Sequence, residues 1–226
     1  MTAEPYPTPD PRSALLQILA THSFRLGDFT LASGQKSDFY IDCRTTTLHA
    51  EGGRLSGLLL YDLIREYIPQ AVAVGGLTMG ADPLVSNIAS SSAWAAADHA
   101  EILHLSSELD LPTDPSEAPP LLHGFLVRKA EKNHGTARRI EGFTEPGAPV
   151  VIVDDVCTTG GSTVTAIEAA REAGMLVAGV LCLVDRQQGG RTRIEEAAAG
   201  VPFLALFTAD DIRASHKLLH TSGPDA

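Results

Sequence analysis

The chain has 226 residues, of which 44% are hydrophobic and 20% are charged, a composition that excludes an intrinsically disordered protein. Its length fits one α/β domain with a sizeable hydrophobic core. The net charge of −11 argues against a general nucleic-acid-binding protein, which needs a basic face.

The predicted elements begin with a short mixed region and continue as a regular alternation. Residues 1–11 are predicted to be a loose tail, 13–20 a helix, 24–30 and 38–43 short strands, and 55–68 an amphipathic helix. Then follow a strand (71–75), a helix (81–97), two strands (121–127 and 150–153), a helix (162–173), a strand (176–184), a helix (191–199), a strand (203–207) and a helix (210–219). Apolar strands that alternate with helices indicate a mostly parallel sheet flanked by helices. Residues 108–120, rich in proline and acids, are predicted to form a surface loop.

The cysteines and the apolar runs bear on the location of the protein. The chain has three cysteines, an odd number, and no two of them have CxxC spacing. We therefore expect Cys43, Cys157 and Cys182 to be reduced thiols and the protein to be cytoplasmic. The first twelve residues lack the cationic and apolar regions of a signal peptide. The longest apolar run, 175–184, is about half of the roughly 20 residues that a membrane span needs. We therefore expect no membrane partner.

Positive charge is concentrated in one segment of this acidic chain. Five of the 17 basic residues lie between Arg128 and Arg139, with only Glu131 against them. A run of this kind is most often a solvated surface. On a chain that is otherwise strongly acidic, it also indicates an anionic ligand.

The most informative segment runs from Val150 to Thr163. An apolar strand leads into Asp154 and Asp155, then into a turn rich in hydroxyl groups and glycine, and then into a helix. Ligands of open α/β sheets bind beyond the carboxyl ends of strands, and a turn followed by a helix N-terminus suits a phosphate. The hydroxyls of Thr158, Thr159, Ser162 and Thr163 are candidate donors to it. The segment matches neither the Walker loop nor the dinucleotide loop, and a plain capped turn is the alternative explanation.

The segment from Asp154 to Ser162 resembles the phosphoribosyl diphosphate (PRPP) signature of the type I phosphoribosyltransferases. The resemblance implies their fold, a mostly parallel sheet flanked by helices with a small N-terminal hood. It also implies that the two acids contact the ribose hydroxyls and that the turn holds the 5-phosphate. The PRPP-binding residues implied here are Asp154, Asp155, Val156, Cys157, Thr158, Thr159, Gly160, Gly161 and Ser162.

Three further segments are similar to the orotate phosphoribosyltransferases within that family. Residues 29–42 resemble their hood, 128–142 their mobile catalytic loop, and 184–187 the strand end whose arginine binds the orotate carboxylate. The resemblance implies a single domain over 12–226, with the hood mainly over 12–48. In the loop it implies that Arg128, Lys129, Lys132 and His134 bind PRPP, and at the acceptor that Thr158 and Arg186 bind orotate.

The implied reaction transfers ribose 5-phosphate from PRPP to orotate, giving orotidine 5′-phosphate and diphosphate in pyrimidine biosynthesis. Lys132, His134, Asp154 and Asp155 are the implied catalytic residues, and His134 is a candidate proton donor to the leaving diphosphate. The implied cofactor is Mg²⁺, held mainly by PRPP near the two acids. The implied assembly is a homodimer in which the loop serves the neighbour's site.

The chain departs from the family pattern at two positions. Ala32 and Met79 stand where some members carry lysines that contact the donor or the acceptor, so other residues must supply any cation there.

A phosphoribosyltransferase for a purine or another base is one alternative function, and a PRPP-binding regulator is another. Arg186 and the basic loop argue against the first, and the acidic net charge against the second. The pair His216 and His220 has the spacing of zinc ligands, but packing is the favoured explanation because no third ligand accompanies it.

Overall fold

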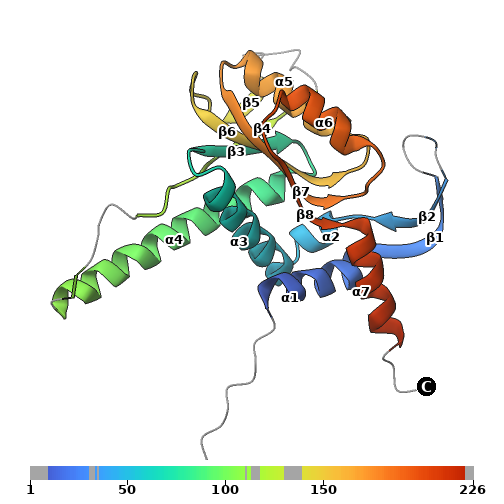
Figure 1. Ribbon diagram of the computed structural model, residues 1–226, viewed down its shortest axis with the longest axis horizontal. Coiled ribbons are helices and arrows are strands. Elements are labelled where there is room, and N and C mark those ends of the chain that lie inside the picture. Colours follow the sequence, from blue (N-terminus) through green and yellow to red (C-terminus); the bar gives the residue numbers. More distant parts are fainter. Residues whose placement is uncertain are drawn as a thin grey trace, which may run out of the picture.

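A six-stranded sheet lies at the centre of the computed structural model, which describes residues 10–30, 34, 36–109, 111–112, 118–129 and 139–221. Its strands are ordered β5-β4-β3-β6-β7-β8, and neighbours pair in parallel except β4 and β5 (Figure 1). The strands are β3 (Ala73–Leu77), β4 (His123–Val127), β5 (Ile140–Gly142), β6 (Pro149–Cys157), β7 (Leu176–Asp185) and β8 (Phe203–Thr208). The predicted fold class, a mostly parallel sheet flanked by helices, is confirmed.

Helices cover both faces of this sheet, which explains why its central strands are apolar along most of their length. On one face pack α1 (Pro11–Ile18), α3 (Ala50–Tyr67), α4 (Asp82–Glu108) and α7 (Ala209–Thr221), and on the other α5 (Gly161–Glu172) and α6 (Gly190–Ala198) (Figure 1). Along β6, Val151 and Val153 are buried in the first core, whereas Val150 and Ile152 are buried in the second. The alternation of side chains along a strand thus gives the sheet one core on each side.

The N-terminal part forms a separate antiparallel hairpin of β1 (Phe24–Thr30) and β2 (Lys36–Ile41). A π-helical turn over Leu19–Ser23 leads into it, and the short α2 (Arg44–Thr47) follows it. Phe24 pairs with Ile41 at the base of the hairpin, and both side chains are buried in the first core, on the side of the sheet that α1, α3, α4 and α7 cover. Most of the rest of β1 is exposed. The hairpin is therefore anchored at its base.

Several elements are longer than the sequence predicted, α4 and β6 among them, and α3 begins at Ala50 instead of residue 55. Helix α4 continues to Glu108 instead of ending near residue 97, because no glycine or proline interrupts residues 84–111. Strand β6 continues through both acids to Cys157, because β7 provides parallel partners along that whole stretch. Of the predicted loop over 108–120, residues 110 and 113–117 lie outside the described part of the chain. The elements α2 and β5, of four and three residues, were not predicted.

The second half of α4 extends beyond the sheet and away from the other described elements (Figure 1). Ile102 and Leu105 in this half are exposed, as is Trp94 at the middle of the helix, whereas Leu84, Val85 and Ile88 in the first half are buried. Within the described ranges, no helix combines the length and the apolar character that are needed to cross a membrane.

Candidate active site

A pocket of about 320 Å³ lies at the carboxyl ends of β3 and β6, beside the base of the hairpin. This is the edge of a parallel sheet at which α/β folds bind their ligands. Three stretches contribute most of its lining: the segment from β2 into α2, the turn after β3, and the end of β6. The lining residues are Tyr40, Ile41, Asp42, Cys43, Arg44, Leu77, Thr78, Met79, Gly80, Lys129, Asp154, Asp155, Val156 and Ser162.

Asp154 is the more buried of the two predicted acids, with 6% of its surface exposed. Its Oδ1 accepts a hydrogen bond from the backbone N–H of Asp155 (3.1 Å), and its Oδ2 accepts one from Thr163 Oγ1 (2.7 Å). Burial, together with the charge of Asp155, raises the pKa of Asp154 to about 7, although the Thr163 hydroxyl opposes this rise. Thr163 was expected to offer its hydroxyl to a phosphate; the structure instead turns that hydroxyl inward to Asp154, in the first turn of α5.

Asp155 lies at the pocket wall, where its Oδ1 accepts a hydrogen bond from the backbone N–H of Val156 (3.0 Å). Burial also raises the pKa of this carboxyl. Gly80, in the turn after β3, packs against it: a Cβ at that position would lie 2.4 Å from Asp155 Oδ1. Because real Cβ atoms do not approach so closely, a larger residue at position 80 would require the Asp155 carboxylate to shift.

The turn between β6 and α5 brings together the predicted phosphate-binding residues. Gly160 has a φ of +73° and precedes α5, and no side chain caps the first N–H groups of that helix. The backbone N–H of Gly190 donates to the carbonyl of Thr158 (3.1 Å) and fixes the turn from the opposite side. Thr159 and Ser162 are exposed, and Thr158 is half-buried. Uncapped N–H groups and exposed hydroxyls at a helix N-terminus form an anion-binding arrangement.

Cys157 is buried in the core that α5 and α6 share with the sheet, and its pKa is raised to about 12, mainly by burial. Its backbone N–H donates to Cys182 Sγ (3.1 Å). A thiol of this kind stays protonated at neutral pH, which agrees with a packing role rather than a nucleophilic one.

Of the predicted loop cations, the structure brings Lys129 to the pocket, where it lies among the lining residues with the two acids. Arg128 makes an ion pair with Glu141 instead (3.1 Å), and its N–H donates to the carbonyl of Arg139 (2.9 Å). Lys132 and His134 lie outside the described residues. Arg128 is thus paired at the base of the loop and does not line the pocket.

Arg186, at the end of β7, is buried to 95% of its surface. Its Nη2 donates to Ser37 Oγ (3.3 Å), its guanidinium lies 4.7 Å from the ring centroid of Phe39, and its Nε has no hydrogen-bond partner in the described part of the structure. Burial lowers the pKa of this arginine. Neither Arg186 nor Thr158 is among the lining residues of the 320 Å³ pocket: Arg186 lies against the hairpin, and Thr158 lies in the turn after β6.

Asp42 and Arg44 also line the pocket, although the sequence did not separate a structural from a functional role for them. Arg44 holds Asp42 in a fork, with Nε to Oδ1 at 2.9 Å and Nη2 to Oδ2 at 2.8 Å. The charge of Asp42 is stabilised by this contact, which lowers its pKa. No local sequence pattern identifies the pair, because its place depends on how the hairpin packs beside the sheet.

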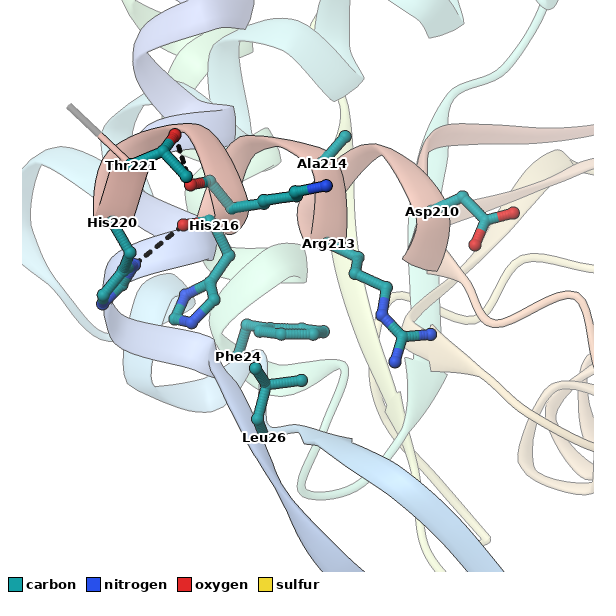
Figure 2. Close-up of a pocket in the computed structure, with 9 residues that line it drawn as sticks. Phe24, Leu26, Asp210, Arg213, Ala214, His216, His220 and Thr221 are labelled. Atoms are coloured by element: carbon teal, nitrogen blue, oxygen red, sulfur yellow. Dashed lines mark hydrogen bonds between the residues drawn. The ribbon is translucent and has the colours of Figure 1, made fainter. Parts of the chain in front are cut away.

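A larger cavity, of about 680 Å³, lies between the start of β1 and α7 (Figure 2). Phe24 and Leu26 face the side chains of α7 across it, and His216 and His220 lie at one end. No group of three His, Cys, Asp or Glu side chains suited to a metal occurs in the described ranges, here or elsewhere. This cavity lacks the paired acids and the glycine turn, so the chemistry of a phosphorylated sugar favours the smaller pocket.

Comparisons with known proteins agree with this geometry. Residues 126–200 match the phosphoribosyl transferase domain family. The chain is 42% identical over 206 residues to an orotate phosphoribosyltransferase of Thermosynechococcus vestitus, covering 91% of this chain and 94% of that protein.

Among solved structures, the orotate phosphoribosyltransferase of Mycobacterium tuberculosis in complex with Fe(III) dicitrate gives a TM-score of 0.67 at 32% identity, covering 90% of this chain and 99% of that one. The same enzyme in complex with PRPP gives a TM-score of 0.64 at 29% identity, with the same two coverages of 90% and 99%.

Proposed function

The chain belongs to the orotate phosphoribosyltransferase family, the pentosyltransferases of pyrimidine biosynthesis, and from this membership we propose the roles of its own residues. The reaction transfers ribose 5-phosphate from PRPP to orotate and releases diphosphate. We propose that PRPP occupies the 320 Å³ pocket and that orotate binds between it and Arg186.

A buried acid and a half-buried one, beside an uncapped helix N-terminus, carry this assignment. Asp154 and Asp155 offer carboxylate oxygens to the ribose hydroxyls, and the turn over 158–162 offers N–H and hydroxyl donors to the 5-phosphate. The residues that we assign to the turn are Val156, Cys157, Thr158, Thr159, Gly160, Gly161 and Ser162, of which Cys157 contributes backbone and packing.

Departure of the diphosphate calls for positive charge and for the exclusion of water. Negative charge develops on the leaving group while the sugar becomes similar to an oxocarbenium ion, which water would hydrolyse. Lys129 lines the pocket, and we propose that Arg128, Lys132 and His134 join it when the loop closes. In this proposal Arg128 exchanges Glu141 for the substrate, and His134 donates a proton to the leaving diphosphate.

The acceptor site rests on Arg186. A buried guanidinium whose Nε has no partner is incompletely satisfied, and the orotate carboxylate would supply a bidentate partner of opposite charge. Phe39, whose ring already lies under this guanidinium, offers a flat apolar surface to the pyrimidine. Thr158, in the turn after β6, is the second residue that we assign to orotate.

The residues around the pocket fit a Mg²⁺ that PRPP brings with it. Asp154 and Asp155 offer oxygen ligands, which Mg²⁺ prefers, but no set of three metal-binding side chains occurs among the described residues, so PRPP would supply most of the ligands. When bound, the ion would neutralise charge on the diphosphate.

We also propose a cytoplasmic homodimer in which the loop over 128–142 serves the neighbour's pocket. Three buried, unpaired cysteines support a reducing compartment.

The test is an assay of the purified chain with PRPP and, in turn, orotate, adenine, xanthine and uracil, each with Mg²⁺ and with EDTA. We expect orotidine 5′-phosphate and diphosphate from orotate alone, lost in EDTA and restored by Mg²⁺. Turnover of a purine but not of orotate would contradict the acceptor assignment, and full activity in EDTA would contradict the Mg²⁺ assignment.

A further inference from the structure

The pocket contains one arginine that no predicted role uses. Arg44 begins α2, directly after the hairpin, and it lines the pocket with Met79 and Asp155. Of the pocket-lining residues, only Arg44 and Lys129 are cationic. The other described candidates face elsewhere, since Arg128 pairs with Glu141 and Arg186 with the hairpin.

Asp42 orients the Arg44 side chain but accepts hydrogen bonds from only some of the N–H donors of its guanidinium. The fork takes up Nε and one hydrogen of Nη2, and the backbone N–H of Arg44 adds a third bond to Asp42 Oδ1 (3.1 Å). A guanidinium has five N–H donors, so three remain. The side chain is still 46% exposed. Its direction is thus fixed while one edge of the guanidinium is left for a ligand.

The position of Arg44 along the pocket indicates which group of the ligand it meets. The hydrogen bond and the charge of Asp42 are the main causes that raise the pKa of Arg44, and the charge of Asp155 adds a smaller contribution, which places Arg44 near that acid. The turn and the N-terminus of α5, which suit the 5-phosphate, border the same pocket through Ser162. With the ribose between Asp154 and Asp155, a second phosphate group would extend away from Ser162. Arg44 and the turn over 78–80 are the lining segments nearest Asp155, since Gly80 packs against that acid and its charge acts on Arg44, whereas Asp154 is hydrogen-bonded to Thr163 in α5.

We propose that Arg44 is a substrate-binding residue that hydrogen-bonds the diphosphate of PRPP. It brings a cation to a pocket in which Met79, at a position where some relatives carry lysine, contributes no charge. This inference rests on the proposed function, because it assumes that PRPP occupies the pocket. Its chemistry is that of an oriented arginine and a phosphate, which form short, charge-assisted and often bidentate hydrogen bonds.

Arg54 offers a matched control on α3. It makes the same fork, with Nε to Glu51 Oε2 at 2.8 Å and Nη2 to Glu51 Oε1 at 2.7 Å, but it is exposed and does not line the pocket. Arg44→Gln and Arg54→Gln therefore remove the same charge and the same type of ion pair. Arg44→Lys keeps the charge but cannot form the fork.

The experiment measures the Kd of PRPP by calorimetric titration with Mg²⁺ and without orotate, and then the KM values of both substrates. Loss of one charge-assisted hydrogen bond should raise the Kd of PRPP in Arg44→Gln about 10-fold or more. Arg44→Lys should show a smaller rise, and Arg54→Gln none. The KM of orotate should stay within about twofold of the wild-type value in all three variants.

Equal PRPP affinity in Arg44→Gln and Arg54→Gln would overturn the inference, as would a rise in the KM of orotate alone. If Arg44→Gln does not fold, wild-type PRPP affinity in Arg44→Lys would also overturn it. Failure of the wild-type chain to turn over orotate would overturn the proposed function instead, before any variant is compared.

Discussion

Asp154 and Asp155 are adjacent carboxyl groups at the end of a central strand, of which Asp154 is buried and Asp155 half-buried. Burial and mutual repulsion raise the pKa of Asp154 to about 7, and the Thr163 hydroxyl counteracts part of this rise. An acid of this kind is held in position for a ligand at a cost in folding free energy when it ionises.

The pH dependence of stability should report this cost. The folded-state pKa of Asp154 lies above its ordinary value of 3.8, so the folded protein binds more protons than the unfolded one between these two values. The group therefore stabilises the fold at low pH, and this contribution is lost as the pH rises toward about 7. Asp154→Asn, neutral at every pH, should be more stable than the wild-type chain at pH 8 by about 1 kcal/mol or more.

Urea denaturation of both chains at pH 5 and pH 8 measures this difference. Other acids, such as Asp42, have lowered pKa values and change stability in the opposite direction, so the quantity of interest is the variant minus the wild type. A difference that does not grow with pH would contradict the raised pKa of Asp154.

Thr163 should act on the reaction only through Asp154. Thr163→Val keeps the shape of the side chain but removes the 2.7 Å hydrogen bond. We expect kcat/KM for PRPP to fall about 10-fold, because a hydrogen bond to a charged group contributes about 1.5–3 kcal/mol. Thr163→Ser, which keeps the hydroxyl group, should retain most of the wild-type activity. Equal losses in the Val and Ser variants would mean that packing, not the hydroxyl, is what matters.

At the scale of elements, only part of strand β6 and part of helix α4 could be predicted from the local sequence. The run Val150–Val153 and the glycines at 160 and 161 made the strand, the turn and helix α5 predictable. The continuation of the strand through the acids was not, because it depends on hydrogen bonds to β7, which a local pattern does not contain. The length of α4 was underestimated because its second half follows helix propensity without a buried face to reveal it.

The two halves of α4 should differ in their contribution to stability. Ile88 is fully buried in the first half, so Ile88→Ala should lower the free energy of unfolding by about 2–5 kcal/mol. Ile102 is 59% exposed in the second half, and Ile102→Ala should change it by less than about 0.5 kcal/mol. Chemical denaturation of both variants checks this. A similar loss in the two would show that the projecting half is buried against something beyond the described chain.

For the whole molecule, the sequence predicted the sheet, its helices and the strand end that bears the acids. Of the cations that reach the pocket, it predicted Lys129 but not Arg44. Lys129 and Arg44 line it, while Arg128 pairs with Glu141, and this selection depends on contacts between segments that are far apart in sequence. The place of Arg44 follows from the packing of a hairpin whose own residues are mostly exposed and carry little signal of where it lies.

Assembly can be tested by complementation between two inactive chains. If the loop serves the neighbour's pocket, a mixed dimer of Lys132→Ala and Asp155→Asn contains one pocket with intact acids and an intact loop. Random pairing of equal amounts should then give about a quarter of the wild-type activity, since half of the dimers are mixed and each has one competent site. Each variant alone is the control. Lack of any recovery after subunit exchange would contradict a loop that acts in trans.

The most direct test of the central claim is the rate of orotidine 5′-phosphate formation by the double variant Asp154→Asn/Asp155→Asn, with its folding checked by thermal denaturation. The wild-type chain should form the product from PRPP, orotate and Mg²⁺. The folded double variant should lose about 100-fold or more in kcat/KM for PRPP, as expected when two charged hydrogen-bond acceptors are removed. Wild-type kcat/KM in the folded double variant would contradict the placement of the reaction at the end of β6.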